Sequence, residues 1–135
     1  MTPATKRSGK KIVIVGIAVT VALLHLVTGK QYTGPYRWFV NGYLIDILLP
    51  FAAYLLLCTI EHPVIRRWWI KCLAVFGLGA TVELSQYFGV PVFGATFDPW
   101  DFAAYGTGVI MAALADLVLF PRILPFWQGE GKEIP

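Results

Sequence analysis

Apolar residues in this chain fall into four long stretches, separated from one another by charged or turn-forming residues. The stretches cover about 12–28, 38–60, 66–88 and 99–120. A helix needs about 20 apolar residues to cross ~30 Å of hydrocarbon, and each stretch is near that length. The pattern predicts an all-α fold, an integral membrane four-helix bundle. A basic segment, 1–11, precedes the bundle and a tail, 121–135, follows it.

The first stretch also has features of a secretory signal peptide. It begins with basic residues, continues with an apolar run and ends in a weak small-residue site at Val27-Thr28-Gly29. The run is slightly long for a signal peptide, and no A-x-A site follows it. We therefore expect a retained membrane helix.

The composition agrees with a membrane protein. Of 135 residues, 57% are hydrophobic and only 14% charged, and a soluble domain of this size could not bury so much apolar surface. Cys58 and Cys72 fit no ligand spacing, so neither a disulfide framework nor a metal site is expected. There is no glycine-rich phosphate loop, and the basic residues are split among short segments. Cofactor and nucleic-acid binding are not predicted, and the lipid bilayer is the expected partner.

The distribution of Lys and Arg predicts the orientation. With a cytoplasmic N-terminus, only Lys30 and Arg37 of the eleven lie outside. The other nine lie inside, as the positive-inside rule requires. Both termini are thus predicted to be cytoplasmic, in a plasma (inner) membrane. We place Phe126 and Trp127 at the inner interface as an anchor before a disordered end.

Four acidic residues fall at the predicted outer side: Asp46, Glu83, Asp98 and Asp101. At ~1.5 Å per residue, Asp46 lies about 12 Å and Glu83 about 8 Å inside their helices. A carboxylate facing lipid near a helix centre costs roughly 2.5–3.5 kcal/mol. We expect these side chains to face the bundle interior or water. Gln86 shares a helix face with Glu83, and Tyr105 shares one with Asp101.

Each of these residues also has a structural interpretation. Asp98 is more simply the N-cap of the fourth helix than a chemical group, whereas capping and function are balanced for Asp101. Glu83 and Asp46 lie away from helix ends, where a hydrogen-bonded clamp and a functional site are equally favoured. Gln86 suits a clamp partner, and a lone histidine, His25, carries little weight.

Two further expectations concern packing. Glycines in the third and fourth helices suit close helix contacts; they are Gly77, Gly79, Gly106 and Gly108. Asp116, in the cytoplasmic half of the fourth helix, should pair with a nearby Lys or Arg.

These motifs resemble a known family. VELSQYF places Glu83 and Gln86 as E-x-x-Q, and FDPWDFAAYGTG places Asp98 and Asp101 as D-x-x-D, followed by Tyr105 and Gly108. This order and spacing resemble the VanZ-like membrane proteins, a family named after a teicoplanin-resistance protein. The resemblance covers roughly 41–116, and a polar residue of an earlier family helix stands where Asp46 does. It implies an envelope role but no established biochemical activity.

The chain departs from the family pattern at two places. The family's Asn is Tyr105 here, a substitution typical of the uncharacterised branch. The Arg usually found before the first Asp is missing from PVFGAT. The carboxylates must then be neutralised by Arg37, by protons or by a bound cation, and transfer of the resistance phenotype is in doubt.

Three functional hypotheses follow, in order of preference. The first is a non-enzymatic cell-envelope factor whose outer carboxylates bind a lipid head group, a glycopeptide-like ligand or a partner membrane protein. The second is a membrane-embedded enzyme acting on a lipid-linked substrate, with two carboxylates as acid and base or as cation ligands; it lacks a nucleophile. The third is an ion-linked transport subunit, which would need an oligomer because the cytoplasmic half offers only Asp116.

Overall fold

The computed structural model describes residues 2–28, 32–91 and 97–127. Four of its helices are long and apolar enough to cross a membrane, namely Pro3–Val27, Arg37–Leu57, Trp68–Tyr87 and Pro99–Ile123. The fold is an all-α four-helix bundle, as predicted, and a multi-pass membrane protein is indicated. The direction of insertion stays a prediction.

The first helix is longer than its apolar stretch. Helix α1 spans Pro3–Thr28, so residues 3–11 of the predicted basic segment are the beginning of this helix rather than a separate element. Thr2 caps it, because its Oγ1 accepts a hydrogen bond from the Thr5 amide at 3.2 Å and so satisfies a free donor of the first turn. Pro3 suits the first position, where no N–H donor is needed.

The second span is built from three pieces. Helix α2 (Arg37–Phe39) leads into a π-helical segment, η1 (Val40–Leu44), and then into α3 (Ile45–Leu57). The helix ends three residues before the predicted residue 60. Pro50 lies inside α3 and has no N–H to donate to the carbonyl of Asp46.

The remaining spans are α4 and a composite helix. Helix α4 covers Trp68–Tyr87. Helix α5 (Pro99–Leu114) continues through the π-helical η2 (Ala115–Leu119) into α6 (Phe120–Ile123), beyond the predicted end at 120. A short 3₁₀ turn, η3 (Pro125–Trp127), follows. The predicted disordered end falls on 128–135, outside the described residues.

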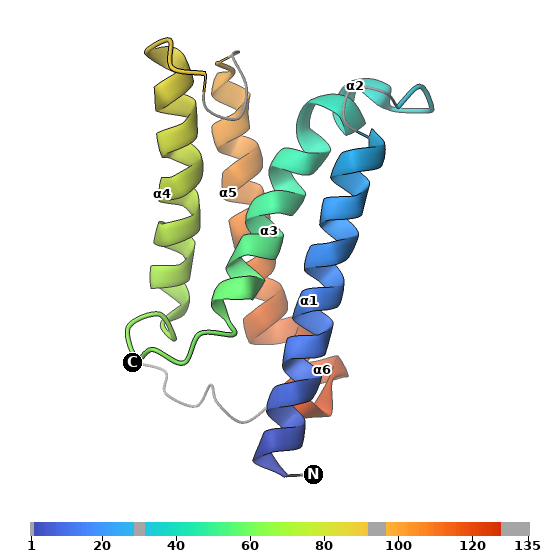
Figure 1. The fold of residues 1–135 in the computed structure, drawn as a ribbon, viewed down its shortest axis with the longest axis vertical. Helices are drawn as coiled ribbons and strands as arrows, with labels where there is room; N and C mark the ends of the chain where they lie inside the picture. Colours follow the sequence, from blue (N-terminus) through green and yellow to red (C-terminus); the bar gives the residue numbers. More distant parts are fainter. Residues whose placement is uncertain (1, 29–31, 92–96, 128–135) are drawn as a thin grey trace.

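The four spans alternate in direction, and α3 lies between the others (Figure 1). It packs most extensively on α5, and also on α1 and α4. The α3–α5 contact is close because Gly108 has no side chain: a Cβ there would lie 2.9 Å from Pro50 Cγ and would collide with the Ile47 carbonyl. The core contains Ile14, Tyr54, Leu55, Val75, Val109 and Ala112.

The predicted glycine contacts hold at two of the four positions. Gly79 and Gly108 each face a neighbouring helix closely. At Gly77 a Cβ would meet nothing within 4 Å, so that prediction is wrong. At Gly106 a Cβ would meet Phe76 at an ordinary 3.7 Å.

The two ends of the bundle differ in charge. We call the end that contains Asp46, Glu83, Asp98 and Asp101 the carboxylate end, and the opposite end, where α1 begins, the basic end. Between them, many large apolar side chains are exposed on the outer surface of the helices, such as Leu26, Leu78 and Ile110. Such a surface suits lipid chains rather than water.

Candidate functional site

Glu83 of α4 is the most buried acid at the carboxylate end, with 1% of its surface exposed. Its Oε1 accepts a hydrogen bond from the Tyr105 hydroxyl on α5 at 2.9 Å. Its Oε2 is buried and has no hydrogen-bond partner in the part of the chain that the structure describes. A buried carboxylate oxygen without a donor is costly, so a proton or a ligand is expected beside it.

Asp101 brings the acids together. Its carboxyl group lies within side-chain hydrogen-bonding reach of both Glu83 and Asp46. The cluster therefore joins α3, α4 and α5 through three carboxyl groups. Two ionised carboxylates repel each other at such a distance, so the contact needs a shared proton or a positive charge. A proton on Asp101 would give the cluster a second hydrogen-bond donor beside the Tyr105 hydroxyl.

Asp98 has a different role from the other three acids. Its Oδ1 accepts from the Trp100 amide at 3.0 Å, which makes it the N-cap of α5, as predicted. Its Oδ2 accepts from the Tyr43 hydroxyl at 3.0 Å. Asp98 thus fixes the start of α5 to the π-helical segment before α3. This leaves Asp101, rather than Asp98, to complete the cluster.

Two backbone features position the cluster. Asp46 follows the π-helical segment η1 by two residues, and π-helical turns are frequent at functional sites. Gly79 makes room for Tyr105, since a Cβ there would lie 2.8 Å from the Tyr105 ring. The ring can therefore lie against α4 and direct its hydroxyl to Glu83. The hydrogen bond from Tyr105 to Glu83 therefore depends on the absence of a side chain at Gly79.

Two sequence candidates have no assigned hydrogen bond in the cluster. Gln86 is half-buried on α4, one turn after Glu83, and its role as a clamp partner stays a prediction. His25 is exposed on α1 and acts electrostatically on Asp46.

A second polar cluster lies at the basic end, and most of it was not predicted. Asp116 pairs with Lys71 at 3.2 Å, as expected for a nearby cation. It also accepts from the Tyr54 hydroxyl at 3.2 Å and from Trp127 Nε1 at 3.0 Å. Lys71 lies 3.2 Å from Cys58 Sγ as well. Every polar atom of this carboxylate is satisfied, which indicates a structural clamp.

Trp127 corrects an expectation. The sequence placed it at the membrane interface as an anchor, yet it is only 5% exposed. Leu124 ends α6 in an extended conformation, and the turn at η3 folds the ring under the bundle against Phe120. A tryptophan has one N–H donor, and here a buried carboxylate takes it. The sequence feature that pointed to this contact was Asp116, because a carboxylate buried in the bundle needs several hydrogen-bond donors.

The carboxylate cluster can share protons or hold a positively charged group. No group of three or more potential metal ligands with suitable geometry occurs among the described residues. Searches against known families, curated proteins and solved structures find no match to this chain.

Proposed function

We propose that this chain is a VanZ-like cell-envelope factor whose carboxylate end, at the outer face of the plasma membrane, binds an amine-bearing lipid head group. The observation that carries this proposal is that Asp101 interacts with both Glu83 and Asp46, while Glu83 has a buried carboxylate oxygen without a donor among the described residues. A primary ammonium offers three N–H donors and one positive charge. It would supply a donor for Glu83 Oε2 and a positive charge, whereas the described chain offers the cluster no ion pair and only the electrostatic influence of His25 on Asp46.

The charges elsewhere in the bundle support a cationic ligand. In residues 2–28, 32–91 and 97–127, the ion pairs are Arg7–Glu61 and Lys71–Asp116, and both lie at the basic end. The outer carboxyls thus receive no Lys or Arg from the described chain. Arg37 is exposed at the start of α2, at the same end as Asp46. It offers a site for the phosphate that accompanies the amine in many lipid head groups.

The contacts between motif positions support the family proposal. Glu83, from E-x-x-Q, is bonded to Tyr105, which stands at the family's Asn position. Asp101, the second acid of D-x-x-D, lies beside Glu83. The motif residues are therefore neighbours in space as well as in order, which gives a physical reason for their spacing.

The geometry is less favourable to the two alternatives. Transport would need polar groups connecting the two ends. On α3, eight residues separate Asp46 from Tyr54, about 12 Å at the rise of a helix, and between them Gly108 packs directly on Ile47 and Pro50. An enzyme would need a nucleophile or a bound metal, and the cluster offers carboxyl groups and one tyrosine.

The test is binding of defined lipids to the purified full-length protein. In detergent, native mass spectrometry would compare adducts of phosphatidylethanolamine, which has N–H donors, with those of phosphatidylcholine, which has none. We expect a preference for the ethanolamine lipid that Glu83→Gln and Asp101→Asn remove. Asp98→Asn is the matched control, because asparagine also caps helices.

Equal binding of both lipids by the wild type would refute the proposal. If Asp98→Asn lost the preference for the ethanolamine lipid together with Glu83→Gln and Asp101→Asn, the preference would depend on the fold and not on the cluster. In cells lacking the gene, complementation by the same variants with envelope-lipid and glycopeptide-susceptibility profiles tests the envelope role. Equal rescue by Glu83→Gln, Asp101→Asn and wild type would leave the carboxylates as helix clamps.

A further inference from the structure

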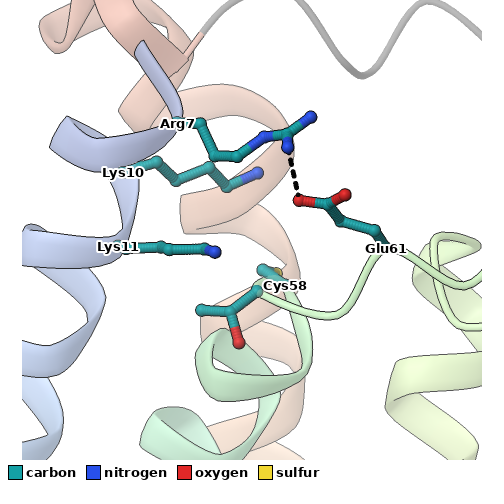
Figure 2. Close-up of a pocket in the computed structure, with 6 residues that line it drawn as sticks. Arg7, Lys10, Lys11, Cys58 and Glu61 are labelled. Atoms are coloured by element: carbon teal, nitrogen blue, oxygen red, sulfur yellow. Dashed lines mark ion pairs between the residues drawn. The ribbon is translucent and has the colours of Figure 1, made fainter. Parts of the chain in front are cut away.

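A pocket at the basic end brings together cations from α1 and the end of α3. It is lined by Arg7, Lys10, Lys11, Cys58, Thr59 and Glu61. Figure 2 shows the three basic side chains extending from α1 toward Cys58 and Glu61. Residues 7, 10 and 11 share one helix face by steps of three and four. The extension of α1 down to Pro3 creates this face, since it makes the basic segment helical.

The pocket has an excess of positive charge. Among the described residues that line it, Glu61 is the one acid, and it pairs with Arg7 at 3.0 Å. Lys10 lies 4.8 Å from the centre of the Trp127 ring, a contact that orients the ammonium without neutralising it. Lys11 adds a third cation. These described residues, three cations and one carboxylate, carry a net charge of about +2, which favours an anion.

Size and position restrict that anion. The pocket is shallow, and its enclosed volume of about 10 Å³ has room for about one water. A phosphate group would therefore lie at the mouth of the pocket, against the ends of the basic side chains, and would not be enclosed by it. The pocket lies where the apolar surface of the bundle ends, so a phosphate held there would have its acyl chains along the helices. Basic pockets between membrane helices on the cytoplasmic side bind anionic head groups in this way.

We infer that this pocket binds the phosphate of an anionic phospholipid from the leaflet at the basic end. The site is separate from the carboxylate cluster and takes a ligand of opposite charge. A bound lipid would also rest beside Trp127 and Cys58, and so beside the clamp around Asp116. The basic residues of α1 then do more than set orientation: they hold a specific head group.

The experiment measures phosphatidylglycerol binding to the purified full-length protein by native mass spectrometry in neutral detergent. We expect one tightly bound lipid and a loss of about 30-fold in affinity for Lys10→Gln/Lys11→Gln, from about 1 kcal/mol for each basic residue. The matched control, Arg67→Gln/Arg122→Gln, removes two exposed cations at the same end outside the pocket. It should change affinity by less than about threefold, because exposed distant charges are screened.

A second variant predicts a change of opposite sign. Glu61→Gln removes a negative charge from the lining of the pocket, so its affinity for an anionic lipid should rise severalfold. The fold should be unaffected because the Arg7–Glu61 pair is half-exposed. Equal losses in the pocket pair and the control pair would overturn the inference in favour of general surface charge. Displacement of the lipid by millimolar inorganic phosphate would also overturn it, because the pocket would then prefer the free anion. Failure here would leave the binding proposed at the carboxylate end untouched.

Discussion

Removal of Lys71 tests how strongly the clamp around Asp116 holds the bundle. The side chains of the pair are only 6% and 8% exposed, and their charged atoms are 3.2 Å apart. In Lys71→Met the aliphatic stem and its volume are kept, but Asp116 loses its counterion. Breaking a buried pair in this way costs about 3–5 kcal/mol. That is a large share of the roughly 5–15 kcal/mol by which folded domains are stable.

The second half of the prediction concerns the double variant. In Lys71→Met/Asp116→Leu neither charge remains, so no uncompensated charge is buried. Replacement of a complete buried pair by apolar residues is often neutral or stabilising. The loss in the double variant should therefore be smaller than the sum of the single losses by about 3 kcal/mol, the upper range for contacting residues. The double variant does not regain full stability, because Asp116→Leu leaves the Tyr54 hydroxyl and the Trp127 N–H without an acceptor.

The assay is unfolding of the purified protein in mixed micelles by increasing dodecyl sulfate, followed by far-ultraviolet circular dichroism. Glu61→Gln is the control, because its partner Arg7 is half-exposed and such pairs contribute about 0–1 kcal/mol. The reasoning would be refuted if each single variant lost less than about 1 kcal/mol of unfolding free energy. It would also be refuted if the loss in the double variant equalled the sum of the two single losses. Either result would show that Lys71 and Asp116 are hydrated rather than clamped.

Two further predictions concern the close contacts of α5. Gly108→Ala should destabilise the bundle by about 1–3 kcal/mol or more, because the new methyl group meets the α3 backbone at Ile47. Gly77→Ala, where the space is open, should be neutral or slightly stabilising in the same unfolding assay, and equal losses would contradict the packing argument. Tyr105→Phe should lower the free energy of unfolding by about 1–3 kcal/mol, because it removes the hydroxyl group that donates a hydrogen bond to buried Glu83. Unchanged stability in that variant would mean that another donor replaces it.

The sequence predicts the spans well because apolar length is a strong signal in a membrane protein. It also brings Asp46, Glu83 and Asp101 to one level, since their depths follow from helix rise. What it misses depends on tertiary contacts. Trp127 folds back under the bundle only because of the turn after α6. Lys71 looks like an orientation signal in the sequence, and only the position of Asp116 shows that it is buried.

The basic pocket was missed for a related reason. From the sequence, residues 1–11 are expected to form a charged segment outside the bundle, because they contain no apolar run. In the structure α1 begins at Pro3 and includes the rest of this segment, and helical spacing directs three of its side chains to the same place. Local propensity favours this, since Ala4 and the four Lys and Arg residues are good helix formers, although Thr5, Ser8 and Gly9 lie among them. The charge pattern shows how many basic residues this segment has, but not the direction in which their side chains extend.

The clamp around Asp116 has a consequence for biosynthesis. Lys71 and Asp116 are 45 residues apart, so at roughly 5–20 residues per second the ribosome makes the lysine about 2–9 s before its partner. During this time the Lys71 ammonium has no counterion in the bundle, and its flexible stem can extend toward water at the basic end. Helix α4 can settle fully only after α5 arrives, and Trp127 follows eleven residues later. Trp127, in the last described turn of the chain, therefore completes a cluster whose lysine, Lys71, is made about halfway through synthesis.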